Sequence, residues 1–292
     1  MGGGKEIGRR LRAVQGTAKI TRAMQLVASS KMARAQRAAL GGRRHEFRLE
    51  ELADLLLREG PAPDPALCAP REVQRRGIVT VATDRGLCGA LNQNVLRAAL
   101  ALDGPARFVA IGRRGAQLLA ARGKELLAEF SINDRVPFAQ VRSIANYLRD
   151  IYLSGTVDTV EVLYPVFVNT LEQRVLAKKL LPLDGLAENL RSRRAILPAL
   201  GNPLPEDPRP LLVEPSRARL AEKLVEEFFR RELFQLLLEA KAAEQSARTV
   251  AMKLATDNAE ALAKELRMEF NKLRQATITG EILEITAAGT VG

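Results

Sequence analysis

The sequence is poor in the residues that build metal sites, disulfide frameworks and aromatic cores. Its 292 residues include two cysteines, one histidine and no tryptophan, and aromatic residues make up 4%. Cys68, Cys88 and His45 are too few ligands for a Cys/His metal site, and two cysteines do not make a disulfide framework. The N-terminus has no apolar signal segment, and no uncharged run is long enough to span a bilayer. We therefore expect no metal, no cofactor and no direct insertion into lipid.

Positive charge is concentrated near the N-terminus. The formal net charge is +11, and residues 1–48 hold twelve Lys or Arg against Glu6 and Glu46, a net charge of +10. Such a segment needs an anionic partner or open water. A nucleic-acid interface usually interleaves aromatic rings, and only Phe47 supplies one among residues 1–50. A membrane-surface helix needs more bulky apolar residues. An acidic protein surface is therefore the interpretation that we favour.

The N-terminal region has the pattern of a packed helix. Apolar or small residues recur at Ile7, Leu11, Val14 and Ala18, and no proline occurs between residues 7 and 57. This spacing is typical of a coiled-coil seam. Gly41-Gly42 interrupts the pattern, and either a bend or a break fits two adjacent glycines.

The C-terminal region predicts a much longer helix. Ser216 is a suitable N-cap, and residues 216–278 contain neither proline nor glycine, which corresponds to roughly 90 Å of helix. One seam is predicted at Ala240, Ala243, Ala247, Val250 and Leu254. A second seam, in a shifted register, is predicted at Leu262, Leu266, Phe270 and Leu273.

The middle of the chain alternates between two periodicities. Strands are predicted at Gly77–Ala82, Arg107–Ile111, Thr156–Val168 and Glu172–Leu181, with a weaker one near Leu126–Ile132, and helices at Val95–Leu102, Arg114–Ala121 and Phe138–Leu153. Alternating strands and helices predict a Rossmann-like α/β domain with a mostly parallel sheet. Pro165 indicates that its strand ends there or lies at an edge.

These regions predict an α/β domain inserted between two long terminal helices that form an antiparallel coiled coil. The expected parts are an N-terminal coiled-coil helix (1–59), a linker (60–75), the α/β globular domain (76–200), a proline-rich linker (201–215) and a long C-terminal coiled-coil helix (216–292).

The loop TDRGLCGALNQN, residues 83–94, lies between a predicted strand and a predicted helix, as many phosphate-binding loops do. A P-loop needs Lys and Ser or Thr after its last glycine, whereas Ala90 and Leu91 follow Gly89. The dinucleotide fingerprint needs three glycines, and this loop has two. We therefore interpret it as a tight turn or a protein-contact loop, with Cys88 as a small turn residue.

The remaining acidic candidates point to no chemistry. Glu226, Glu227, Glu239 and Glu244 fall within the long C-terminal helix and are interpreted as polar-face residues. We assign no catalytic residue to this chain.

Five segments carry a resemblance to a known family. KITRAMQLVASSKM (19–32), the loop TDRGLCGALNQN, and the C-terminal blocks EQSARTVAMK (244–253), ATDNA (255–259) and NKLRQATITGEILEI (271–285) are similar to the gamma subunit of F-type ATP synthases. The resemblance extends over the whole length and element order, and the C-terminal blocks are the most specific part.

This resemblance implies a central rotor stalk that couples ion flow through the membrane c ring to ATP synthesis or hydrolysis at the alpha/beta head. The implied partners are the alpha and beta subunits, the epsilon subunit and the c ring, at the cytoplasmic side of a bacterial inner membrane. By position, the implied partner contacts are Arg274, Gln275 and Thr279 at the tip, Met24 on the first helix, Arg85 and Cys88 in the loop, and Glu214 at the foot.

Two other interpretations stay open from the sequence alone. A coiled-coil nucleic-acid-binding protein would bind DNA with a steep salt dependence. An α/β enzyme with helical arms would bind a small ligand at the strand ends. The coupling ion, the preferred direction of turnover and the c-ring size leave no mark in the sequence.

Overall fold

The structure, a computed structural model, describes residues 2–58, 65–102, 104–169, 172–183, 214 and 216–289. The chain divides into two compact units. We call Met1–Ser30 with Arg248–Gly292 the coiled-coil unit, and Lys31–Ala247 the α/β unit. Both long terminal helices contribute to both units, whereas the predicted domain boundaries lie at the proline-rich linkers. Residues 59–64 and 201–213 of those linkers lie outside the described residues.

The elements follow the predicted order closely. They are α1 (Gly2–Arg58), α2 (Pro65–Cys68), β1 (Arg76–Val81), α3 (Leu91–Leu100), β2 (Ala106–Ile111), α4 (Arg113–Ala120), β3 (Leu126–Phe130), α5 (Phe138–Leu153), β4 (Thr159–Phe167), β5 (Gln173–Leu181) and α7 (Arg217–Gly289).

The ends of the two long helices agree with the sequence pattern. Ser216 precedes α7, and its Oγ accepts a hydrogen bond of 3.4 Å from the Arg219 amide, which is the geometry of an N-cap. The helix α1 continues through Gly41 and Gly42, so the glycine pair does not break it.

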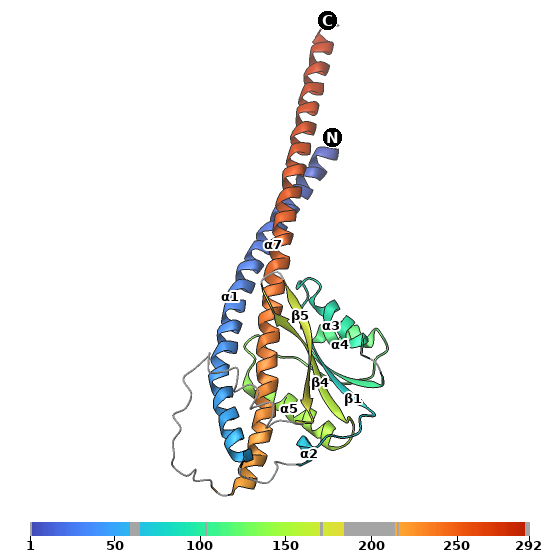
Figure 1. Cartoon of the computed structure of the whole chain (residues 1–292). Coiled ribbons are helices and arrows are strands. Elements are labelled where there is room, and N and C mark those ends of the chain that lie inside the picture. The colour runs from blue at the N-terminus through green and yellow to red at the C-terminus, as the bar shows by residue number, and fades with distance from the viewer. Residues whose placement is uncertain are drawn as a thin grey trace. The chain divides into compact units, whose positions relative to one another are not determined.

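In the coiled-coil unit, α1 and α7 run antiparallel. A Cβ atom placed on Gly8 would lie 3.3 Å from the Phe270 ring, while Thr21 lies against Thr256. Later residues of α1 therefore lie beside earlier residues of α7. Figure 1 shows the N-terminal end of α1 and the C-terminal end of α7 at the same end of this unit, with α7 extending further.

The seam of α7 in this unit differs from the predicted one. Leu254, Leu262 and Leu273 are 60%, 45% and 37% exposed, so their placement in a seam was wrong. A regular series of buried and half-buried residues is formed by Met252, Thr256, Ala259, Ala263 and two predicted seam residues, Leu266 and Phe270. Their spacing of 4-3-4-3-4 is that of a regular heptad seam. The small residues allow the helices to pack closely, and Leu254, Leu262 and Leu273 lie outside.

The α/β unit contains a five-stranded sheet in the order β3-β2-β1-β4-β5. The β1–β2, β1–β4 and β2–β3 pairs are parallel, and β4–β5 is antiparallel, which confirms the mostly parallel sheet. Pro165 does not end its strand. It pairs with Val175 of β5, but the β1 pairing stops at Leu163, so the other side of Pro165 needs no amide donor.

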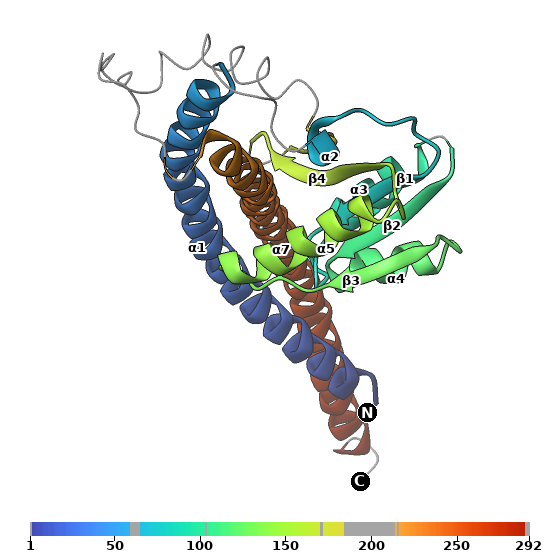
Figure 2. The same ribbon diagram turned by 90° about the horizontal axis from the view of Figure 1, so that it is seen from below.

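Helices cover both faces of this sheet. One face packs on α3 and α4 around Ile78, Phe108 and Leu163. The opposite face packs on α5 and on the segment of α7 from residue 224 to residue 240. Figure 2 shows α5 on this face of the sheet, and the Phe138 and Phe234 rings, 5.5 Å apart, join it to α7.

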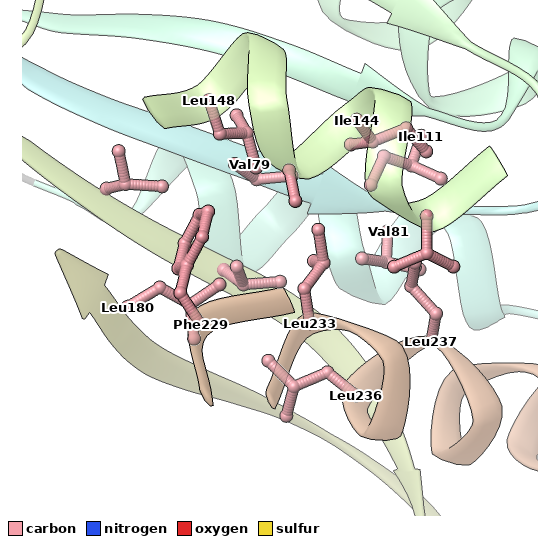
Figure 3. Close-up of a cluster of buried hydrophobic side chains, with 14 of the residues drawn as sticks. Val79, Val81, Ile111, Ile144, Leu148, Leu180, Phe229, Leu233, Leu236 and Leu237 are labelled. Carbon is pink, nitrogen blue, oxygen red and sulfur yellow. The ribbon is translucent and has the colours of Figure 1, made fainter. Parts of the chain in front are cut away.

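The segment of α7 that follows residue 224 is therefore part of the core of the α/β unit. Figure 3 shows Phe229, Leu233 and Leu237 of α7 pointing toward side chains of α5 and the sheet. Phe229 is 2% exposed, and Leu233 and Leu237 are 0% exposed. Burial of this kind stabilises by about 1.5–3 kcal/mol per large side chain. The sequence predicted a coiled-coil role for this helix and did not place it in the core of the α/β domain.

Candidate partner-binding surfaces

The loop between β1 and α3 satisfies its own polar groups. The Thr83 hydroxyl donates to the Arg85 carbonyl at 2.6 Å and accepts from the Asn92 side-chain amide at 2.8 Å. The Asn92 Oδ1 atom accepts the Thr83 amide at 3.1 Å. The same Asn92 amide lies 3.4 Å from the Cys88 Sγ atom. These bonds hold the loop as a closed turn, as the turn interpretation requires.

A second set of bonds ties this loop to its neighbours. The Asp84 carboxylate accepts the Arg113 amide at the start of α4 and the Ser131 hydroxyl after β3, at 3.1 and 3.0 Å. Three loops at the same end of the sheet are thereby connected through one side chain.

The loop exposes some predicted contact residues and buries another. Arg85 is exposed, and Leu87 beside it is 60% exposed with a positive φ of 64°. Cys88 is only 2% exposed and packs on Leu91 and Ala247 of α7. Arg85 and Leu87 are therefore side chains of this loop that reach solvent, whereas Cys88 is packed inside it. Leu87 was not among the residues singled out from the sequence.

The tip residues lie together on one helix. Arg274, Gln275 and Thr279 are exposed, and the Thr279 hydroxyl donates to the Gln275 carbonyl at 2.9 Å. Residues four apart in a helix share a face, so Gln275 and Thr279 point the same way. Every residue from Asn271 to Thr279 is exposed, which means that no described segment of the chain covers this part of α7.

The other predicted contacts are also on the surface or at its edge. Met24 is half-buried between the seam residues Thr21 and Ala28, and Glu214 is exposed shortly before α7.

The coiled-coil unit exposes an unusual number of large apolar side chains. Ten of them are more than a third exposed, namely Ile20, Leu26, Val27, Leu254, Leu262, Met268, Leu273, Ile278, Ile282 and Leu283. Exposed apolar side chains in this number are what a partner-binding surface supplies. The strict 4-3 spacing from Met252 to Phe270 is the signal that would have placed Leu254, Leu262 and Leu273 outside.

The described helices of this chain differ from membrane-spanning helices. In the part of the chain that the structure describes, none of them combines the length and the apolar character needed to cross a membrane.

Comparison with known proteins gives a consistent result. Residues 3–290 match the protein family described as ATP synthase. The chain is 42% identical to the ATP synthase gamma chain of Opitutus terrae over 288 residues, 97% of each chain. It is 36% identical to the ATP synthase gamma chain of Methylacidiphilum infernorum, again over 97% of each chain.

Solved structures show the same fold. A chain of the Euglena gracilis mitochondrial ATP synthase, described as OSCP/F1/c-ring, has a TM-score of 0.65 at 18% identity, covering 99% of this chain and 95% of its own. A chain of the Tetrahymena thermophila mitochondrial ATP synthase central stalk and c ring has a TM-score of 0.58 at 23% identity, covering 81% and 99%.

The fold and the exposed surfaces define a coiled-coil protein with a five-stranded α/β sheet and an uncovered helical tip. The chain belongs to the ATP synthase gamma chain family. Its function is that of the central stalk of a rotary ATP synthase, which couples ion flow to ATP synthesis or hydrolysis.

Proposed function

We propose that the coiled-coil unit is the axle that turns inside a ring of alpha and beta subunits. The observation that carries this proposal is the fully exposed run Asn271–Thr279, which includes Leu273 and Ile278. A single helix with apolar side chains around it is only marginally stable in water and is stabilised when other subunits surround it. The cationic residues of α1 fit acidic surfaces of the same ring of subunits.

The α/β unit is the part that stands on the membrane c ring, with the epsilon subunit beside it. Exposed Glu214 is our candidate contact with the c ring. The complex would lie at the cytoplasmic side of a bacterial plasma (inner) membrane, and this chain would be held there through the c ring. Nucleic acid and inserted lipid have no part in this function.

Each candidate contact has a defined role in this proposal. Arg274, Gln275 and Thr279 contact one beta subunit at a time. All three are exposed near one face of the tip, so the subunit on that side can reach them. Met24 meets the moving part of a beta subunit along the first helix. Arg85 meets a partner at the loop, which Cys88 supports from within.

Rotation changes catalysis because one asymmetric axle contacts three equivalent sites differently. A partner shifts a conformational equilibrium only through differential contacts with its states. The beta subunit that faces Arg274, Gln275 and Thr279 is therefore held in a different conformation from the two that do not. Turning the axle passes each conformation from one subunit to the next.

Catalysis itself belongs to the neighbouring subunits in this proposal. We expect that the purified chain alone hydrolyses no ATP. The assignment would be refuted if phosphate were released from ATP in proportion to the concentration of this chain, and if this proportion held through successive purification steps.

Co-expression tests the function directly. The chain is expressed with the alpha and beta subunits of a related enzyme, and the purified complex is assayed for ATP hydrolysis. We expect the three chains to co-purify and to hydrolyse ATP faster than alpha and beta without this chain. Failure to co-purify, together with salt-sensitive binding to DNA, would favour the nucleic-acid interpretation instead.

A further inference from the structure

The apolar packing of α7 in the α/β unit is nearly periodic along the helix. Phe229, Leu233 and Leu237 follow one another at intervals of four residues, and all three are buried against the sheet and α5. A displacement of α7 by one turn would bring Leu233 to the place of Phe229 and Leu237 to the place of Leu233. Cores tolerate exchanges among large apolar residues of similar volume. Apolar contacts alone therefore define the position of α7 along the sheet only weakly.

One charged side chain interrupts this periodicity. Glu232 is 4% exposed, and its carboxylate forms an ion pair with the Nζ atom of Lys178 on β5. The other carboxylates of the same segment, Glu226, Glu227 and Glu239, are only partly buried. Glu226 also pairs across elements, with Arg149 of α5 at 3.2 Å, but both of those side chains are 25% exposed. Glu232 is thus the carboxylate of this segment that is buried against the sheet.

We propose that the Lys178–Glu232 pair sets the register of α7 against the sheet and so fixes the height and angle of the axle. A one-turn displacement would move the Glu232 carboxylate about 5.4 Å from its place beside Lys178. It would leave a buried carboxylate without its partner, which is strongly unfavourable. A single buried polar pair that selects one register among similar apolar packings is a known use of such groups.

A second polar contact shows that β5 follows α7 lengthwise. Gln173 of β5 lies 3.5 Å from the Ser246 hydroxyl of α7. Gln173 precedes Lys178 by five residues, about 17 Å of strand, and Ser246 follows Glu232 by fourteen residues, about 21 Å of helix. The two elements are therefore antiparallel neighbours, and β5 is the strand along which α7 would slide.

The consequence for the stalk rests on the central-stalk function proposed above. Because α7 continues as one helix to Gly289, a slip of four residues at Glu232 shifts every later residue by about 6 Å and turns it by about 40°. Arg274 and Gln275 would then meet the beta subunits at another height and angle. A helix that transmits an angular position must not slide along the sheet that holds it. We call the Lys178–Glu232 pair, which would prevent such sliding, the register lock.

A distance measurement on the isolated chain tests the lock without any partner. Spin labels are placed at the exposed positions Lys179 of β5 and Lys223 of α7, with Cys68 and Cys88 replaced by Ala. The lock is then replaced by an apolar pair, Lys178→Met with Glu232→Leu. We expect one distance in the parent chain and a second population, displaced by about 5 Å, in the apolar variant. A single, unchanged distance in the apolar variant would overturn the proposal.

Two further variants separate register from stability. The exchanged pair, Lys178→Glu with Glu232→Lys, should restore a single distance, because the attraction is the same with its partners interchanged. The matched control replaces the exposed ion pair Glu172–Arg174 at the start of the same strand by Glu172→Gln with Arg174→Met, and should keep one distance. A second population in this control would show that any change in β5 has this effect and would also overturn the proposal.

Coupling in the assembled enzyme provides the functional readout. In membrane vesicles, we expect the apolar variant to hydrolyse ATP at a near-normal rate but to pump at least twofold fewer ions per ATP than the parent. If the apolar variant does not assemble, Glu232→Gln, which keeps the side-chain volume, takes its place. A parental pumping ratio in the assembled variant would contradict the lock. Failure of the parent chain to assemble would count against the central-stalk function and leave the label distances as the test of the lock.

Discussion

The hydroxyl groups of Thr21 on α1 and Thr256 on α7 form a hydrogen bond of 2.7 Å inside the coiled-coil seam. Both side chains are buried, at 9% and 2% exposure. Each hydroxyl also has a backbone acceptor in its own helix, the Met252 carbonyl at 2.8 Å for Thr256 and the Ala18 carbonyl at 3.1 Å for Thr21, so either threonine can donate to the other. This bond is directional and joins the two ends of the chain, 235 residues apart in sequence.

Replacing either threonine by valine removes this bond while keeping the shape of the side chain. We expect Thr21→Val and Thr256→Val each to lower the free energy of unfolding by about 1 kcal/mol. In a double-mutant cycle the two changes should be non-additive by about 0.5–1.5 kcal/mol. Urea unfolding of the purified chain measures both quantities. Thr17→Val is the control, because Thr17 is exposed and bonds only its own helix at Ala13, so its effect should stay within about 0.5 kcal/mol.

The glycines of α1 should respond differently to alanine. Gly16 has open space where a Cβ atom would go, so Gly16→Ala should stabilise the helix by up to about 1 kcal/mol. At Gly8 the new Cβ atom would lie 3.3 Å from the Phe270 ring, which must move. Gly8→Ala should therefore gain less, and a larger side chain there should separate the helices. Equal stabilisation at both positions in urea unfolding would contradict the close approach at Gly8.

Gly112 is required where the chain turns from β2 into α4. Its φ is +107°, and a Cβ atom there would lie 2.4 Å from the Ala82 carbonyl oxygen. Gly112→Ala should destabilise the α/β unit by more than about 2 kcal/mol, since strain and a backbone clash add. Gly104, with φ of +87° and no neighbouring atom in reach, is the matched control for backbone strain alone. The unfolding temperature of Gly112→Ala should lie well below that of Gly104→Ala. Equal unfolding temperatures would contradict a contribution from the contact with Ala82.

The tip residues should matter for coupling and not for folding. Arg274→Ala with Gln275→Ala should lower the ATP hydrolysis rate of the assembled complex several-fold, because the contact with beta is lost, while the unfolding temperature of the chain stays the same. Glu269→Ala is the control, since Glu269 is exposed on the opposite face of the same helix. Full activity of the Arg274 and Gln275 variant, or an equal loss in the control, would argue against a contact between these two residues and the beta subunit.

The type and order of the elements could be predicted from local signals. The predicted strand at residues 107–111 and helix at 138–153 agree with β2 and α5 to within a residue or two. Alternating or continuous apolar runs and a 3.6-residue period are properties of neighbouring residues, so they survive without tertiary information. The long helix, its N-cap and the resemblance of its C-terminal blocks are local in the same sense.

Which side chains of a long helix face inward was less predictable. Leucines at 254, 262 and 273 were placed in the seam because large apolar residues usually lie inside, yet the smaller residues do so here. The interpretation of Glu244 as a polar-face residue was also wrong, since it is 4% exposed and pairs with Lys241, whose Nζ atom lies 3.0 Å away. Burial depends on what surrounds a helix, and the helical period is the same whichever face is covered.

The sequence by itself determined the two proline-free helices, the strand and helix order, and the family to which they point, because each follows from residues close together in the chain. Only the tertiary structure decided that α7 completes the core of the α/β unit and that Lys178 meets Glu232 there. These two residues are separated by more than fifty positions, and no periodicity within either segment records their contact. The pairing exists because the folded sheet places the half-exposed Lys178 beside a carboxylate that the helix buries.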